Sequence, residues 1–120
     1  VTAAPYGHLR DFVFNRASYG YTIRFLQEYI LEKQLFPLEE GIRRLTSLPA
    51  ESAGLKNRGR ISEGCAADLV MLYLEQIVDH TTDDSPQEYP SGIEMVMVNG
   101  EIVLDQNRHT LVLPGQLLPD

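Results

Sequence analysis

The hydrophobic residues of this 120-residue chain change their spacing near Asn57, and this change constrains the fold more than any other feature. Before that point, apolar residues recur every three or four positions, as they do on one face of a helix. After it, they form short runs of strand length that are separated by turn residues. This order of patterns predicts an α+β protein, with N-terminal helices followed by a small antiparallel or mixed β domain.

Two helices are predicted in the first half. The first covers 17–34 and ends before Phe36-Pro37, because proline disfavours the α conformation in the residue before it. A second helix follows from Leu38, with a stop and restart at Pro49, and Gly54 is expected to cap it in the left-handed conformation. The apolar stripe of the first helix consists of Tyr19, Ile23, Leu26 and Ile30, and that of the second of Leu38, Ile42, Leu45 and Leu48.

The second half is predicted to be extended. We expect a short extended segment at 58–61, a turn at Glu63-Gly64, an apolar strand within 67–74 and a long polar surface loop at 79–91. The strongest local signal is Asn99-Gly100, which separates the β-rich runs Ile93–Val98 and Glu101–Leu104. Asparagine and glycine suit the positive φ angles of a two-residue turn, so a hairpin is predicted there.

Composition limits the classes of function. The protein carries 17 acidic and 10 basic residues, which disfavours nucleic-acid binding because that begins with phosphate neutralisation. No run approaches the roughly 20 apolar residues of a membrane span. Cys65 is the only cysteine, so an internal disulfide is impossible and a thiolate zinc site has no second sulfur. A cytoplasmic location is the inference from this cysteine usage.

No catalytic, cofactor-binding or metal-binding residue can be assigned from the residues alone. The three histidines, His8, His80 and His109, form no pair at metal-ligand spacing, and surface exposure is expected for each. Asp68 could be a general base or a metal ligand, or it could accept hydrogen bonds from backbone N–H groups and fix a turn; we favour the structural role. Cys65 resembles a packed thiol.

An ordered series of motifs resembles the C-terminal signature of the amidohydrolase superfamily. Its ending further resembles the branch of N-acyl-D-amino-acid deacylases, the D-aminoacylases. The resemblance covers Leu38–Leu118 well, although Gly41 stands where the family more often carries alanine. The superfamily motifs are Leu45–Glu51, Gly54-Leu55, Arg58–Ile61, Glu63-Gly64, Ala67–Val70 and Val98–Gly100, and those of the branch are Ile77–Asp79, Tyr89–Glu94 and Pro114–Leu118.

The resemblance implies an enzyme that hydrolyses the amide bond of N-acyl-D-amino acids with a zinc ion held in a βα barrel. In that family the zinc ligands belong to earlier barrel strands. The aspartate at the end of the eighth barrel strand is expected at or just before Val1, whereas no aspartate in this sequence precedes Asp11. We therefore transfer no catalytic residue. The chain, which does not begin with Met, is expected to be a truncated piece that is inactive alone.

In this interpretation, residues 1–57 are outer helices from the end of the missing barrel, and 58–120 belong to a small β domain. The barrel would be its partner, and self-association of the isolated chain is a further expectation. Two alternatives stay open: a free-standing binding or regulatory module, and an accessory subunit that completes a catalytic partner. Mutations would begin with His8, Asp11, Asp68 and His80 if the protein proved active.

Overall fold

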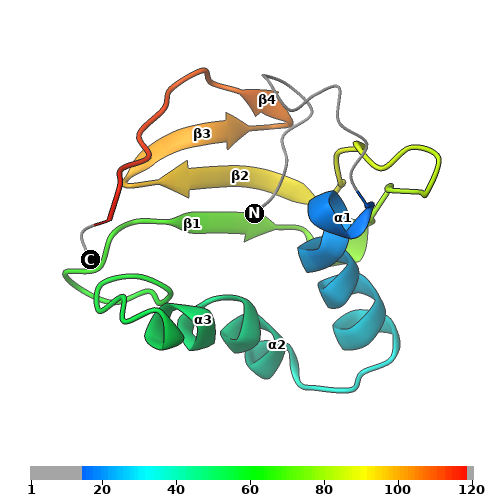
Figure 1. The fold of residues 1–120 in the computed structure, drawn as a ribbon, viewed down its shortest axis with the longest axis horizontal. Coiled ribbons are helices and arrows are strands. Elements are labelled where there is room, and N and C mark those ends of the chain that lie inside the picture. Colours follow the sequence, from blue (N-terminus) through cyan, green and yellow to red (C-terminus); the bar gives the residue numbers. More distant parts are fainter. Residues whose placement is uncertain (1–14, 119–120) are drawn as a thin grey trace. The chain divides into compact units, whose positions relative to one another are not determined.

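The computed structural model describes residues 15–118 of the chain, which form an α+β protein (Figure 1). The contacts divide it into two compact units. One unit joins the segment that ends at Gly41 to Leu74–Gly92, and the other joins Ile42–Tyr73 to the segment from Ile93 onward. Each unit is therefore built from two separate stretches of sequence. The predicted division at residue 57 concerns domains of a longer protein, and it stays a prediction.

The first predicted helix is present, but it changes its winding. Helix α1, Ala17–Arg24, continues without a break as the π-helix η1, Phe25–Glu32. At its end the Lys33 N–H donates to the Glu28 carbonyl 2.9 Å away, the five-residue spacing of a π-helix. The same spacing brings the Lys33 ammonium to the Glu28 carboxylate at 2.6 Å. The sequence predicted the helix but not its wider turns.

The predicted apolar stripe of this helix forms most of the core of the first unit. Ile23, Leu26 and Ile30 are 8%, 4% and 4% exposed, and Ile77 from the second stretch is 4% exposed. The loop at 79–91 is mostly irregular, as expected, but it is not entirely on the surface, because Thr81 is only 4% exposed. No helix within residues 15–118 combines the length and the hydropathy that crossing a bilayer requires.

Two short helices follow, α2 at Leu38–Leu45 and α3 at Ser47–Ser52. Pro49 lies in the first turn of α3, where its missing N–H costs nothing. Gly54 ends this helix with a φ of +73°, as predicted. Gly41 in α2 is explained by close packing, since a Cβ there would lie 2.7 Å from the Ile30 side chain.

The segment 58–61 was predicted to be extended, but the structure shows bends there. It belongs to an irregular loop between α3 and the sheet, in which Gly59 has a φ of +79° and Gly64 a φ of +80°. Left-handed residues cannot continue a strand, so the backbone turns at both glycines. The predicted turn at Glu63-Gly64 is confirmed.

The second unit contains a four-stranded antiparallel sheet in the order β1-β2-β3-β4 (Figure 1). Its strands are β1 (Leu69–Leu72), β2 (Ile93–Val98), β3 (Glu101–Asp105) and β4 (Arg108–His109). The predicted hairpin at Asn99-Gly100 is confirmed, with Val98 paired to Glu101. Strand β4 was missed, because its two residues are too few to show a periodic pattern.

The two faces of the sheet carry different apolar side chains. Val70 pairs with Val96, which pairs with Leu104, so these three share one face. The other face carries all three methionines, with Met71 opposite Met95 and Met97 opposite Leu69. Val70 and Met71 are 56% and 50% exposed on the edge strand. Apolar side chains thus remain accessible on both faces of β1.

Gly59 provides a test of the packing between α3 and the loop that follows it. A Cβ at Gly59 would lie 2.6 Å from the Ala50 Cβ and 2.8 Å from the Thr46 carbonyl oxygen, whereas one at Gly54 would meet nothing within 4 Å. Both glycines have similar positive φ angles. Alanine at either position should therefore cost about 1–2 kcal/mol of backbone strain. Gly59→Ala should cost about 1–3 kcal/mol more, because its methyl group overlaps neighbouring atoms. Urea unfolding of the two variants measures the difference, and equal losses would contradict this packing.

Candidate functional site

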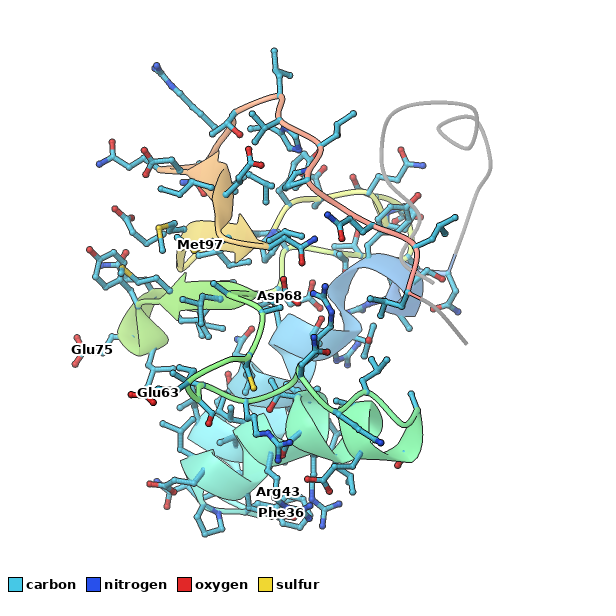
Figure 2. All side chains as sticks on the ribbon, turned by 90° about the vertical axis from the view of Figure 1, so that its left-hand side faces the viewer. Phe36, Arg43, Glu63, Asp68, Glu75 and Met97 are labelled. Atoms are coloured by element: carbon cyan, nitrogen blue, oxygen red, sulfur yellow. The ribbon has the colours of Figure 1, made fainter. Side chains whose placement is uncertain are left out.

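The principal polar network of the second unit joins three residues that the sequence places far apart. The Arg58 guanidinium donates through Nη1 to Oδ2 of Asp68 and through Nη2 to Oδ1 of Asn99, the latter at 2.6 Å. Oδ1 of Asp68 accepts from the backbone N–H of Asn99 at 2.8 Å. Figure 2 shows Asp68 at the start of β1. Each of the three residues is therefore bonded to the other two.

The local backbone explains why these residues meet. Asn99 and Gly100 have φ angles of +48° and +83°, as a two-residue hairpin turn requires. The Gly100 N–H donates to the Ala67 carbonyl at 3.0 Å, which holds the turn beside the residue that precedes Asp68. The Asn99 side chain also donates through Nδ2 to the Pro114 carbonyl at 2.7 Å. We call Arg58, Asp68, Asn99 and the Pro114 carbonyl the clasp.

The clasp lowers the pKa of its carboxyl group. Burial of the Asp68 carboxyl group by itself raises its pKa. The hydrogen bond from the Asn99 backbone N–H and the nearby Arg58 guanidinium act in the opposite direction. Together they outweigh burial, so the pKa of Asp68 lies below its usual value. Asp68 is therefore ionised near neutral pH, and each of its oxygens accepts a hydrogen bond.

This arrangement suits a structural role better than a catalytic one. Each oxygen of Asp68 accepts a hydrogen bond from within the second unit, from Arg58 on Oδ2 and from the Asn99 N–H on Oδ1. Within residues 15–118, no three side chains of His, Cys, Asp or Glu form a group that could hold a metal ion. The described residues therefore do not fit a zinc centre. Asp68 accepts from a backbone N–H, as the favoured sequence interpretation required, although the turn that it fixes is distant in sequence.

His80 lies in the first unit and contacts a hydroxyl group. Its Nε2 is 3.1 Å from Ser91 Oγ, and that hydroxyl donates to the Gln76 carbonyl at 3.0 Å. The single hydroxyl proton is thus directed at the carbonyl, and the histidine nitrogen is the donor to Ser91. An activated serine needs the opposite polarity, with the histidine accepting the proton. This pair is therefore a loop contact rather than a nucleophile and its base.

The remaining sequence candidates are not brought together. His109 is exposed in β4, where its Nδ1 accepts the Leu111 N–H at 3.0 Å. Cys65 is a half-buried free thiol in the loop before β1. His8 and Asp11 lie outside the described residues. His80 and His109 are exposed, as the sequence predicted.

A buried carboxylate in the first unit was missed by sequence reasoning. The Asp79 side chain is 5% exposed, and its Oδ1 accepts the Thr81 N–H at 2.9 Å. Its own N–H donates to Gln27 Oε1 at 2.9 Å, and Arg16 Nη2 lies 3.8 Å from Oδ2. Gly20 permits this burial, since a Cβ there would lie 2.4 Å from Oδ1. The available signal was an aspartate at the start of a polar segment, which commonly accepts a backbone N–H two residues later.

Two further surface features offer little chemistry. Glu28 lies between Lys33 and Arg24, and hydrogen bonds from these residues, that of Lys33 first, lower the pKa of Glu28. An open groove beside η1 is lined mostly by apolar residues and by no ionisable side chain, so it provides no set of groups for acid–base work. Its lining consists of Ile30, Leu31, Gln34, Leu35, Phe36, Pro37 and Leu38.

The chain belongs to the amidohydrolase family, whose sequence model matches residues 3–104. It is similar to three enzymes of Alcaligenes xylosoxydans xylosoxydans: it is 39% identical over 88 residues to an N-acyl-D-glutamate deacylase, 35% over 100 to an N-acyl-D-aspartate deacylase and 36% over 95 to a D-aminoacylase. These matches cover 73%, 83% and 79% of this chain, but only 18%, 20% and 20% of the relatives. The protein thus spans about a fifth of their length.

Solved structures agree with this assignment. A crystal structure of D-aminoacylase has a TM-score of 0.79 and 34% identity over 82% of this chain and 21% of its own. An N-acyl-D-glutamate deacylase of Bordetella bronchiseptica, complexed with zinc and a phosphonate inhibitor, has a TM-score of 0.74 and 34% identity over 78% of this chain and 20% of its own. The resemblance inferred from the ordered motifs is thereby confirmed.

The lowered pKa of Asp68 predicts an acid-sensitive contribution to stability. A carboxyl group whose pKa is depressed by folding stabilises the fold above its unfolded pKa of about 3.9, and it loses that contribution as the pH falls through the lower folded value. Asp68→Asn should therefore reduce the free energy of unfolding by about 1–3 kcal/mol at pH 7, the usual effect of removing a hydrogen bond to a charged group. The difference from wild type should shrink as the pH falls below about 4.

Thermal unfolding measured from neutral to acidic pH tests this prediction. Asp105→Asn is the matched control, because Asp105 is an exposed carboxylate in β3 of the same sheet. A constant difference between wild type and Asp68→Asn at every pH would show that the charge of Asp68 contributes nothing.

Proposed function

We propose that this protein is the C-terminal portion of an amidohydrolase that hydrolyses the amide bond of N-acyl-D-amino acids, and that it does not catalyse this reaction alone. The observation that carries the proposal is the similarity to three deacylases over 73–83% of this chain, combined with coverage of only 18–20% of those enzymes. We place the protein in the cytoplasm, with its single cysteine as support.

The chemistry of the whole enzyme would depend on residues outside this sequence. Related structures hold metal: one is described as having a binuclear metal centre, and another is complexed with zinc. When bound, such an ion lowers the pKa of a water molecule and polarises the scissile carbonyl. The described residues of this protein supply no set of ligands for it, and the clasp keeps Asp68 occupied. We therefore assign the metal ligands and the proton-transferring group to parts of the enzyme other than residues 15–118.

The role proposed for this protein is structural. Among the strands of residues 15–118, β1 is an edge strand with no partner on its outer side, and its apolar side chains Val70 and Met71 are about half exposed. Exposed apolar surface and free strand edges commonly mark places that another segment covers. The proposed partner is the remainder of the same enzyme, including its barrel, with the helices described above contributing to the exterior of that barrel.

Metal content and turnover of the purified protein test the proposal directly. We expect no stoichiometric zinc and no hydrolysis of a panel of N-acyl-D-amino acids, because no ligand set lies within the described residues. The N-acyl-D-glutamate deacylase of Alcaligenes, measured in parallel, is the positive control. Mixing the protein with a separately produced barrel portion should restore turnover if the two parts assemble. Stoichiometric zinc together with turnover by the protein alone would overturn the proposal.

The uncovered sheet predicts self-association of the isolated protein. Val70 is 56% exposed on the edge strand β1, where a second copy can pair or pack. Val70→Lys should lower the apparent mass in light scattering, since charged lysines on an edge strand oppose pairing. Ile61→Lys is the control, because Ile61 is 90% exposed but lies in the loop outside the sheet. A strictly monomeric wild-type sample, or equal effects of both substitutions, would contradict this expectation.

A further inference from the structure

Asn99-Gly100 is the only Asn-Gly pair in the sequence; the other three asparagines, Asn15, Asn57 and Asn107, are each followed by arginine. Asparagine is chemically labile, and a following glycine places no side chain in the way of the reaction. In this reaction the backbone nitrogen of the glycine attacks the amide carbon of the asparagine side chain. The sequence of the hairpin turn is therefore also the most reactive sequence for deamidation in the protein.

The clasp restrains both reacting groups. The attacking atom would be the Gly100 nitrogen, whose N–H donates to the Ala67 carbonyl at 3.0 Å. The carbon to be attacked belongs to the Asn99 amide group, whose oxygen accepts from Arg58 at 2.6 Å and whose nitrogen donates to Pro114 at 2.7 Å. Ring closure needs the Asn99 side chain to be free to bring Cγ onto the Gly100 nitrogen, and the two hydrogen bonds that hold its amide group oppose this movement. The nitrogen must also lose the proton that it now donates.

We propose that Asn99-Gly100 is a deamidation site that the clasp holds in check and whose conversion releases the C-terminal segment at Pro114. The Gly100 nitrogen bonds to Cγ of Asn99 and gives up its proton, the bond between Cγ and Nδ2 breaks, and ammonia leaves. Water then opens the resulting succinimide at either carbonyl, which yields aspartate or isoaspartate at position 99. No reactant other than water is needed.

Either product breaks the clasp at the same place. An aspartate side chain has no donor for the Pro114 carbonyl, and its negative charge is added beside Asp68. Isoaspartate adds a methylene group to the backbone of a two-residue turn, whose length sets the pairing of β2 with β3. Among the described residues, the other hydrogen bonds of the segment 110–118 lie at its start. The Thr110 N–H donates to the Val103 carbonyl at 3.0 Å, the Thr110 hydroxyl donates to the Ile102 carbonyl at 2.7 Å, and the Leu111 N–H donates to His109 Nδ1 at 3.0 Å.

Peptide mapping by mass spectrometry during incubation at mildly alkaline pH tests the restraint. Deamidation of Asn99 should be on the order of tenfold slower in native buffer than in urea, since a charge-assisted hydrogen bond must open first. Arg58→Lys loses the planar two-pronged donor and should accelerate the native reaction by roughly tenfold. Arg60→Lys is the matched control, because Arg60 donates to the Lys56 carbonyl in the same loop and should react at the wild-type rate.

Several results would overturn the proposal. Equal rates in buffer and urea would show that the fold gives no protection. Equal rates in Arg58→Lys and Arg60→Lys would remove Arg58 from the mechanism. Faster reaction at Asn57 or Asn107 than at Asn99 would contradict the assignment of the site.

The released segment is tested separately in solution by heteronuclear NOE measurements. Asn99→Asp reproduces one product, and it should lower the NOE of residues 112–118 while leaving β2 and β3 unchanged. Asn99→Gly is the second variant, in case Asn99→Asp misfolds. Glycine suits the positive φ of +48° at this position, so the substitution removes only the side-chain contacts. Asn107→Asp, in the turn between β3 and β4, is the control. An unchanged NOE in both position-99 variants would overturn the release.

Discussion

The second unit depends on one interaction, the hydrogen bond that the Asn99 N–H donates to the Asp68 carboxylate. Asp68 immediately precedes β1, and Asn99 lies in the turn between β2 and β3. This hydrogen bond therefore links the start of the edge strand to the turn of the hairpin. Arg58 neutralises the carboxylate and grips the asparagine side chain. Without that cation, a partly buried carboxylate would be costly to keep ionised. The motifs that identify the family in this region are thus parts of one bonded assembly rather than independent signatures.

The two units are stabilised in different ways. The first has a small apolar core, in which Ile23, Leu26, Ile30 and Ile77 are nearly inaccessible, together with a buried carboxylate that Gly20 makes room for. In the second unit, Ala50 is the only buried apolar residue among those described. The sheet of this unit therefore depends on strand pairing and the clasp more than on burial. A sheet that has so little buried surface is consistent with the proposal that the rest of a longer enzyme completes it.

Local patterns in the sequence predicted the elements that local rules determine. The helical stripe at 17–34, the left-handed Gly54 and the Asn99-Gly100 hairpin follow from periodicity and backbone preference, and the structure confirms them. The π winding of η1 could not be foreseen, because its buried residues Leu26 and Ile30 are four positions apart, a spacing that an ordinary α-helix also gives. The segment 58–61 was wrongly predicted as extended, because Gly59 turns the backbone with a φ of +79° and lies where a Cβ would overlap Ala50. The pairing of Arg58, Asp68 and Asn99 likewise depends on tertiary structure, although the separate residues were each recognised.

Because each unit is assembled from two stretches, the first unit cannot finish folding until its second stretch, Leu74–Gly92, has been synthesised. The π-helix ends at Glu32, but its Gln27 side chain accepts the Asp79 N–H, so residues 33–79 must be added before this contact can form. At 5–20 residues per second, translation of that stretch takes roughly 2–9 seconds. During this interval the helix lacks the part of its packing that the second stretch supplies. The discontinuous architecture therefore makes the yield of folded protein sensitive to the speed of the ribosome across the α2–β1 region.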